Sequence, residues 1–272
     1  MMKNFFPRVG SGLLAGAAAV LLALPGCRPA RVEGPKPQAA RPQPPARPKL
    51  LSWRVASAYL EDIFAQIPNS SIDDFRKDTP DEERLRVNAS HGEAGLKENN
   101  AHVYGEPSAQ ATDQILRKLE LGPQDVLYDF GCGRAFFLMQ ALLSSPIRKA
   151  VGVELAGSRV AVGRAAHRML LDQGLLEGGK RLELYEQDMT QAGLDDATVV
   201  FMDSVFFSDE LLNTMARRMA RVPHLRAVVM IMKGLPPNPW FEKVATERLK
   251  MSWSPRFGSD VLFFKRTGVP VD

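Results

Sequence analysis

Three acidic residues follow or end successive apolar segments, and a glycine turn comes directly after the first. The turn reads Asp129-Phe-Gly131-Cys132-Gly133, Glu154 ends the second segment, and Asp188 lies just past the third. Glycines between a strand and a helix let backbone N–H groups approach a ligand closely. A dinucleotide pyrophosphate favours Gly-x-Gly-x-x-Gly, but position 136 is Phe. An acid two residues before the first glycine instead favours a ligand with a cationic amino-acid end.

S-adenosylmethionine has such an end, and the spacing assigns each acid a part of it. Asp129 would face the amino-acid end, and Glu154 would accept both ribose hydroxyls. Asp188 would take the adenine amino group, with Met189 against the ring. Each acid alone has a second interpretation as a helix cap. A nicotinamide dinucleotide is the alternative cofactor. Three acids in register beside one glycine turn favour S-adenosylmethionine.

The elements that must position these residues alternate regularly from residue 125 onward. The sequence predicts strands over residues 126–130, 150–154, 182–186, 199–203 and 227–232, and helices over 136–144, 159–171 and 209–220. Such alternation indicates parallel strands with helices on both faces. A terminal antiparallel hairpin is expected over 249–253 and 261–264, joined by 254–260.

The fold class predicted from this order is α/β. It is a doubly wound, Rossmann-like, seven-stranded sheet with a C-terminal antiparallel hairpin and a small N-terminal helical cap. The cap begins with apolar residues at helical spacing from Trp53 to Ile67, which stop at Pro68.

The composition is that of a globular protein. The 272 residues are 45% hydrophobic and 24% charged, which excludes disordered, collagen-like and multi-span membrane classes. Residues 1–50 hold 8 of the 35 Lys and Arg residues and 1 of the 31 acids, so the remainder has 27 bases and 30 acids. The net charge of +4 is therefore no argument for nucleic-acid binding. The two cysteines and four histidines lack metal-ligand spacing, so neither a zinc site nor a disulfide framework is expected.

The N-terminal 27 residues have the pattern of an export signal. Lys3 and Arg8 precede an apolar run over residues 13–24, which is shorter than the roughly 20 residues that span a bilayer. Leu24-Pro-Gly-Cys27 resembles the bacterial lipoprotein box, in which the cysteine is lipidated. This predicts a lipid-anchored protein of the cell envelope; the alternatives are an uncleaved anchor, with the domain on the cytoplasmic face of the membrane, or a misassigned start. Residues 28–49 form a predicted Pro/Arg-rich linker.

Further motifs identify a family. They are Val103-Tyr104-Gly105-Glu106-Pro-Ser108, Gly152-Val-Glu154, the run from Val199 to Phe207, and Ser252-Trp253. Together with the glycine turn, they resemble the non-SET histone-lysine methyltransferase family, the disruptor-of-telomeric-silencing type, over about residues 99–265. The resemblance implies a class I methyltransferase that uses S-adenosylmethionine. It implies a cap with the cofactor loop over 50–110 and the methyltransferase domain over 111–272.

The resemblance also implies roles for single residues. Tyr104, Gly105 and Glu106 would form a loop, outside the core, that closes on the methionine end of the cofactor. The turn with Gly131, Cys132 and Gly133 would bind the cofactor too. The candidate catalytic residues are Tyr104, Asp203, Ser204 and Phe207, the last as an aromatic of a lysine channel.

Three positions depart from the family pattern. Asp203-Ser204 stand where the family has paired asparagines, and Val205 stands where the first aromatic would follow. Ala135 replaces the third glycine of the turn. The first two departures concern the lysine substrate more than the cofactor.

The sequence leaves the methyl acceptor open. Transfer to a protein lysine requires a neutral amine, and an apolar channel built from Phe206 and Phe207 would favour that form; both residues have an alternative interpretation as core aromatics. A small-molecule N- or O-methyltransferase has the same cofactor half. A third hypothesis is an inactive binding module tethered to the envelope. S-adenosylmethionine is made in the cytosol, so an exported enzyme would lack its methyl donor. The partners expected are a protein or small-molecule acceptor and a membrane; no histone substrate is inferred, since the only basic stretch is the short linker.

Overall fold

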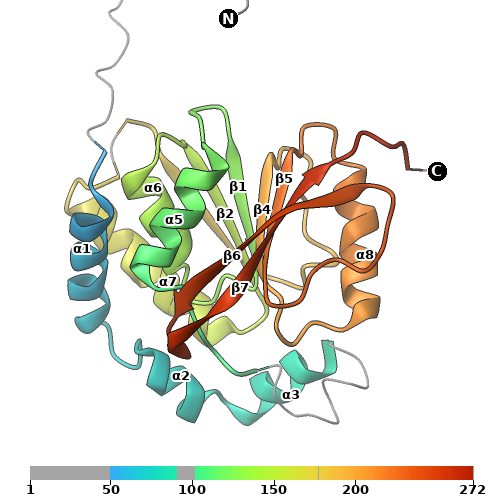
Figure 1. Ribbon diagram of the computed structural model, residues 1–272. Coiled ribbons are helices and arrows are strands. Elements are labelled where there is room, and N and C mark those ends of the chain that lie inside the picture. The colour runs from blue at the N-terminus through green and yellow to red at the C-terminus, as the bar shows by residue number, and fades with distance from the viewer. Residues whose placement is uncertain (1–49, 91–101, 177, 272) are drawn as a thin grey trace, which may run out of the picture. The chain divides into compact units, whose positions relative to one another are not determined.

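The computed structural model describes residues 50–90, 102–176 and 178–271, and all of them belong to one compact unit. Its centre is a single seven-stranded sheet with the order β3-β2-β1-β4-β5-β7-β6 (Figure 1). The first five strands pair in parallel, while β7 runs antiparallel to both β5 and β6. The strands are β1 Val126–Phe130, β2 Lys149–Glu154, β3 Arg181–Glu186, β4 Val199–Asp203, β5 Ala227–Ile231, β6 Phe241–Met251 and β7 Ser254–Arg266. The predicted fold class is confirmed.

Alternating side chains of the central strands enter two separate cores. In β4, Val199 and Phe201 belong to one buried cluster and Val200 and Met202 to the other. The first cluster includes residues of α1 Trp53–Ala65, α5 Ala109–Leu119, α6 Phe136–Ser144 and α7 Gly157–Asp172; the second includes residues of α8 Asp209–Ala220. A sheet covered on both faces buries nearly continuous apolar strands, which explains the composition of β1, β4 and β5.

Serine residues fix where several helices begin. Ser52, Ser108 and Ser208 each accept a hydrogen bond from the backbone N–H three residues later, at the starts of α1, α5 and α8. The helix over Trp53–Ala65 confirms the one predicted from apolar spacing.

Two short helices, α2 Ile72–Asp78 and α3 Asp81–Ser90, lie between α1 and the cofactor loop. They run along the lower edge of the molecule in Figure 1. Arg86 Nη2 of α3 donates to the Leu155 carbonyl at 2.6 Å and lies 3.3 Å from Glu186 Oε1. Glu83 accepts from the N–H and hydroxyl of Ser158 at 2.8 and 2.6 Å. These contacts hold α3 across the carboxyl ends of β2 and β3.

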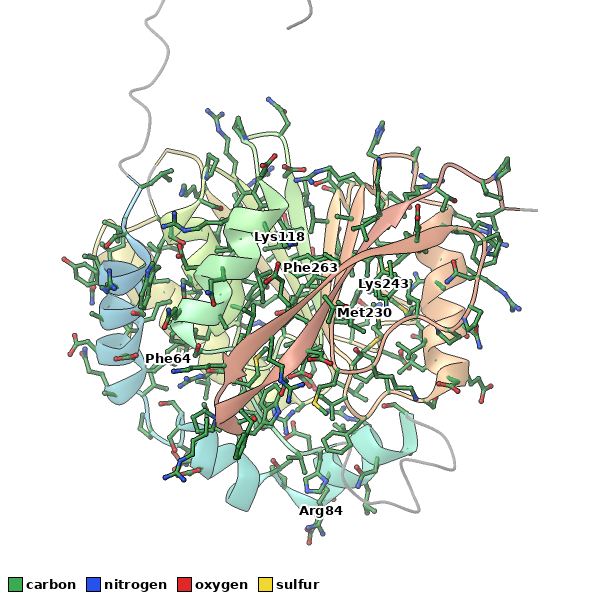
Figure 2. The ribbon with its side chains drawn as sticks, viewed as in Figure 1. Phe64, Arg84, Lys118, Met230, Lys243 and Phe263 are labelled. Atoms are coloured by element: carbon green, nitrogen blue, oxygen red, sulfur yellow. The ribbon has the colours of Figure 1, made fainter. Side chains whose placement is uncertain are left out.

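The C-terminal hairpin is present, but the predicted strand boundaries are wrong. β6 begins at Phe241, and the turn lies at Ser252-Trp253, so residues 254–260 are strand and not the connection. The charged β6 is an edge strand with one exposed face, and its sequence therefore lacks the apolar signal of the central strands. Lys118 of α5 lies 5.2 Å from the ring centroid of Phe263 of β7 (Figure 2), and its Nζ pairs with Glu247 Oε1 at 2.6 Å.

The export signal, Cys27 and the Pro/Arg-rich linker lie outside the described residues. Among the helices of the described ranges, none is long and apolar enough to cross a membrane.

Candidate functional site

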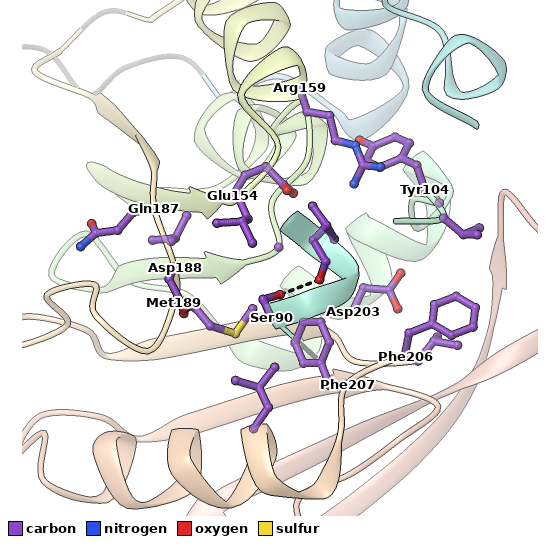
Figure 3. Close-up of a pocket in the computed structure, with 18 of the residues that line it drawn as sticks. Ser90, Tyr104, Glu154, Arg159, Gln187, Asp188, Met189, Asp203, Phe206 and Phe207 are labelled. Atoms are coloured by element: carbon purple, nitrogen blue, oxygen red, sulfur yellow. Dashed lines mark hydrogen bonds between the residues drawn. The ribbon is translucent and has the colours of Figure 1, made fainter. Parts of the chain in front are cut away.

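A pocket of about 250 Å³ opens at the carboxyl ends of the parallel strands (Figure 3). This is the edge where ligands bind in open α/β sheets. Eight of the residues predicted from the sequence line it: Tyr104, Gly105, Gly131, Glu154, Asp188, Met189, Asp203 and Phe207. Five others lie outside its lining: Glu106, Asp129, Cys132, Gly133 and Ser204.

Asp129 is the penultimate residue of β1 and Asp203 the last residue of the adjacent strand β4, and each has an oxygen that lacks a partner. Asp129 is 3% exposed, and the Oδ1 atoms of both residues are buried without a hydrogen bond. Burial raises the pKa of Asp129 well above its usual range, and the charge of Asp203 adds to this effect. Burial also raises the pKa of Asp203 to about 7, against a smaller opposing effect of the Val205 backbone N–H. A carboxyl oxygen that is buried without a partner, as in Asp129 and in the half-buried Asp203, can be satisfied by a cation.

Glu154 is buried at the end of β2, and both of its oxygens accept backbone hydrogen bonds. Oε2 accepts from Gly133 N at 2.9 Å, and Oε1 accepts from Ala156 N at 2.8 Å. The residue therefore joins the glycine turn to the start of α7 while also lining the pocket. The helix-cap interpretation and the ligand interpretation of this acid are compatible, because a carboxylate oxygen accepts more than one hydrogen bond.

Asp188 and Met189 lie side by side in the pocket wall beyond β3, next to Gln187 (Figure 3). Oδ1 of Asp188 accepts from both the N–H and the hydroxyl of Thr190, at 2.7 and 2.8 Å. This local turn fixes the direction of the carboxylate.

The glycine turn requires left-handed backbone conformations, which glycine adopts without strain. Gly131 and Gly133 have φ values of +86° and +53°, and Ala135 has a φ of +64°. A Cβ on Gly133 would overlap the Tyr104 ring, so the turn and the cofactor loop fit only with glycine at that position. Ala135, where the family has a third glycine, keeps the left-handed conformation despite its methyl group.

The loop of Tyr104, Gly105 and Glu106 was predicted to lie outside the core, and this is wrong. Tyr104 is 5% and Glu106 is 8% exposed, and Tyr104 belongs to the main core cluster. Main-chain and side-chain bonds fasten the loop to the β6–β7 turn: Glu106 N donates to Ser252 Oγ at 3.0 Å, and Ser252 N donates to Glu106 O at 2.9 Å. A Cβ on Gly105 would overlap the indole of Trp253. This docking could not be predicted from local sequence patterns, because the two segments are 146 positions apart.

Arg134, which the sequence analysis did not single out, holds the carboxylate of Glu106. Its Nε and Nη2 donate to the two oxygens of Glu106 at 2.7 and 2.9 Å, and its Nη1 donates to the Ser70 carbonyl at 2.8 Å. The Tyr104 hydroxyl also donates to Glu106. Bidentate pairing of this kind is strong and directional. It keeps the Glu106 carboxylate behind the pocket wall, away from the position that the resemblance implied. A basic residue inside the glycine turn was the only sequence signal for it.

Ser204 and Cys132 point away from the pocket. The Ser204 hydroxyl is within hydrogen-bonding distance of the carbonyls of Ile231 and Lys233, at 3.1 and 2.5 Å, so it joins the ends of β4 and β5. Cys132 is buried, and burial raises the pKa of its thiol well above the usual range. The turn residue therefore lacks the thiolate character of a nucleophile.

Aromatic side chains form the wall beside Asp203. Phe206, Phe207 and Trp253 line the pocket, and so does Val205. Figure 3 shows Phe206 and Phe207 on the side of the pocket where Asp203 lies. Phe207 lies close to Gly131, whose added Cβ would stand 3.6 Å from the ring. An apolar wall next to a buried carboxyl group is a place for an alkyl chain that carries a basic end.

The residues present fit S-adenosylmethionine. The orphaned oxygen of Asp129 suits its cationic methionine end, Glu154 is placed for the ribose, and Asp188 with Met189 for the adenine. The fold and this set of groups define a class I methyltransferase that uses S-adenosylmethionine.

The comparisons give the family. The model of the family described as "Histone methylation protein DOT1" matches residues 94–238, more than half of the chain, and the chain belongs to this family. An RNA methyltransferase from Salinibacter ruber, solved with S-adenosyl-L-homocysteine, is 20% identical over 60% of this chain and 95% of its own, with a TM-score of 0.45. Magnesium protoporphyrin IX methyltransferase from Synechocystis PCC 6803, solved with bound S-adenosylmethionine, is 17% identical over 75% of this chain and 99% of its own, with a TM-score of 0.45. Among curated proteins, no match was found.

Proposed function

We propose that the protein methylates the side-chain amine of a lysine in another protein. The observation that carries the proposal is the position of Asp203 in the pocket beside Phe206, Phe207 and Trp253, with one carboxyl oxygen that is buried and has no hydrogen-bond partner. Membership of a histone-methylation family supports a protein lysine as the acceptor.

The protein contributes to methyl transfer mainly by positioning the reactants. When bound, S-adenosylmethionine supplies a methyl group that its sulfonium already activates. The chain must exclude water and hold the acceptor's electron pair in line. The lysine ammonium must also lose a proton before it can react.

Asp203 is suited to that proton. Its pKa is about 7, so at neutral pH a substantial fraction of the Asp203 carboxyl groups is ionised. A general base works best when its pKa lies near the working pH, as it does here. The apolar surface of the aromatic side chains disfavours the ammonium form of a lysine and so lowers its pKa. Asp203 would accept the proton, and the acceptor amine would remain neutral beside Phe207.

The test is labelling of proteins by the full chain with radioactive methyl-labelled S-adenosylmethionine. A protein mixture is offered either untreated or with its lysine amines blocked by acetylation. We expect label in the untreated mixture, recovered as methyl-lysine after hydrolysis, and little in the blocked one. Equal labelling of both mixtures, or label found only in small molecules, would overturn the proposal.

Asp203→Asn is the matched variant, since the resemblance gives the family an asparagine at this position. The parent rate should fall as pH drops below about 7, because Asp203 becomes protonated. The Asn variant should be slower, with that limb of the pH profile missing. An unchanged profile would contradict the proton-accepting role.

A further inference from the structure

One side chain in the pocket wall carries a positive charge, whereas the other charged side chains of the described lining are acidic. Arg159, in the first turn of α7, is 4% exposed and lines the pocket. Among the described residues of the lining, it is the only one with a cationic side chain. The acids of the same lining are Glu154, Asp188 and Asp203.

The guanidinium of Arg159 is held in place by its neighbours, but only part of its hydrogen-bonding capacity is satisfied. Its Nη2 donates to the His102 carbonyl, and its carbon Cζ lies 4.9 Å from the centroid of the Tyr104 ring. Its Nε is buried without a hydrogen-bond partner, and no carboxylate of the described residues pairs with it. Figure 3 shows the head group beside Tyr104, on the side of the pocket that Glu154 occupies. A buried cation with an unsatisfied donor costs free energy unless a ligand pairs with it.

Other nitrogen groups near Arg159 also bear on whether an anion binds here. Two side-chain nitrogens lack hydrogen-bond partners, whereas backbone N–H groups at the start of α7 already have acceptors. The Nδ1 of His102 and the Nε of Arg84 are also buried without hydrogen bonds. Burial lowers the pKa of His102, and the charges of Arg84 and Arg159 lower it further. Two backbone N–H groups at the start of α7 are already taken, since Glu154 accepts from Ala156 and Glu83 from Ser158. The free capacity for an anion therefore lies on the Arg159 side chain.

We propose that Arg159 binds a carboxylate in this pocket, and that the carboxylate is that of the cofactor's methionine end. The methionine end carries an ammonium and a carboxylate. Asp129 suits the first, whereas both Asp129 and Asp203 would repel the second, and Arg159 supplies the opposite charge. Tyr104 holds the guanidinium by stacking, so the cofactor loop and α7 build this subsite together.

The subsite rests on cofactor binding and not on the identity of the acceptor, so its test is calorimetric. Two ligands are titrated into the full chain: S-adenosylhomocysteine, which has the amino-acid end, and 5′-methylthioadenosine, which lacks it. Arg159→Met should weaken S-adenosylhomocysteine at least tenfold and 5′-methylthioadenosine less than twofold. Arg159→Lys should lie between the parent and the Met variant. Arg168→Met, which removes an exposed charge from the same helix, is the control and should change neither affinity.

The ratio of the two affinities decides the outcome. Equal weakening of both ligands by Arg159→Met would show a structural role and overturn the proposal. Unchanged S-adenosylhomocysteine affinity would overturn it as well, and would point to an acidic group on the methyl acceptor as the partner of Arg159. Failure of the protein to methylate lysine would leave these affinities unaffected, so the two proposals fail separately.

Discussion

Asp129 and Glu154 are both buried acids at the ends of neighbouring strands, but their surroundings differ. Glu154 accepts backbone N–H groups from Gly133 and Ala156 and so stabilises the fold without a ligand. Asp129 has an oxygen without a partner and a raised pKa. At the residue scale, one acid is part of the framework and the other is held ready for a charge that the chain itself does not supply.

This contrast predicts different consequences of removal. Asp129→Asn should weaken S-adenosylmethionine at least tenfold, since a charge-assisted hydrogen bond contributes about 1.5 to 3 kcal/mol, while leaving the unliganded protein as stable as the parent or more so. Glu154→Ala should weaken the cofactor and also lower the free energy of unfolding by about 1 to 3 kcal/mol, because two N–H groups lose their acceptor. Calorimetry and urea unfolding measure the two quantities. Unchanged affinity in both variants would refute the assignment of the cofactor to this pocket.

The raised pKa of Asp203 predicts how stability depends on pH. An unfolded Asp ionises near pH 4, whereas folded Asp203 ionises at about 7. Its contribution is fully present below about pH 4 and is lost as pH rises toward 7, because the unfolded chain releases its proton first. The parent should therefore lose free energy of unfolding as pH rises from 4 to 7, and Asp203→Asn should not. Relative to the parent, the variant should gain roughly 2 to 4 kcal/mol over this range.

Urea unfolding at a series of pH values checks this difference. Replacement of an exposed acid, Asp172→Asn, is the control and should leave the pH dependence as in the parent. A gain for Asp203→Asn that is the same at pH 4 and pH 7 would contradict the role of ionisation.

At the scale of elements, the cofactor loop connects three parts of the molecule. Arg134 ties it to the glycine turn and to Ser70 after α1, and Ser252 ties it to the β6–β7 turn. The Arg134 guanidinium also lies 4.2 Å from the centroid of the Phe64 ring in α1. The loop is therefore a fixed wall of the pocket, built by side chains and not by its own secondary structure.

The ion pair of Glu106 and Arg134 predicts strong coupling between the two positions. Arg134→Met should lower the free energy of unfolding by about 3 to 5 kcal/mol, because it leaves the Glu106 carboxylate buried without its partner. Adding Glu106→Gln should recover part of that loss. Urea unfolding of both single variants and the double variant gives the coupling energy, and additive losses would mean that the pair is not a unit.

Gly105 predicts a steric limit on how the loop docks. Gly105→Ala would push against the Trp253 indole, and overpacking of this kind costs about 1 to 3 kcal/mol. We expect a lower melting temperature and weaker cofactor binding, because both residues line the pocket. Gly193→Ala is the matched control, since nothing lies within 4 Å of its added Cβ. Equal melting temperatures for the two variants would show that Trp253 yields without cost.

The elements that the sequence predicted well are those with a strong local signal. The parallel strands, α6 and α8 follow from apolar segments and helical spacing, and the acids at strand ends follow from the strand boundaries. The β6–β7 turn and the docking of Glu106 on Ser252 were missed because they depend on contacts between distant segments. Arg159 was missed because a single arginine in a helix has no local pattern, and only the folded pocket gives it a role.

At the scale of the whole molecule, the N-terminal sequence predicts a membrane anchor and the side of the membrane on which the domain lies. Lys3 and Arg8 ahead of the apolar run 13–24 predict export of the following chain, with Cys27 lipidated. The linker, however, carries six bases: Arg28, Arg31, Lys36, Arg41, Arg47 and Lys49. Bases next to an uncleaved segment tend to remain inside. The two rules conflict, and the position of Gly26 before Cys27 favours export, because a plain anchor has no need of a small residue there.

The prediction is that the mature protein starts at a lipidated Cys27 and faces the outer side of the membrane. Labelled palmitate should be incorporated by the parent and by Cys132→Ala, whose cysteine is buried, but not by Cys27→Ala. Added protease should digest the domain in spheroplasts. An unlabelled, protected domain would place the enzyme on the cytoplasmic face, beside the pool of its cofactor. A labelled, accessible domain would instead require that S-adenosylmethionine reach the pocket from the cytosol, because the acids that fit it are all in place.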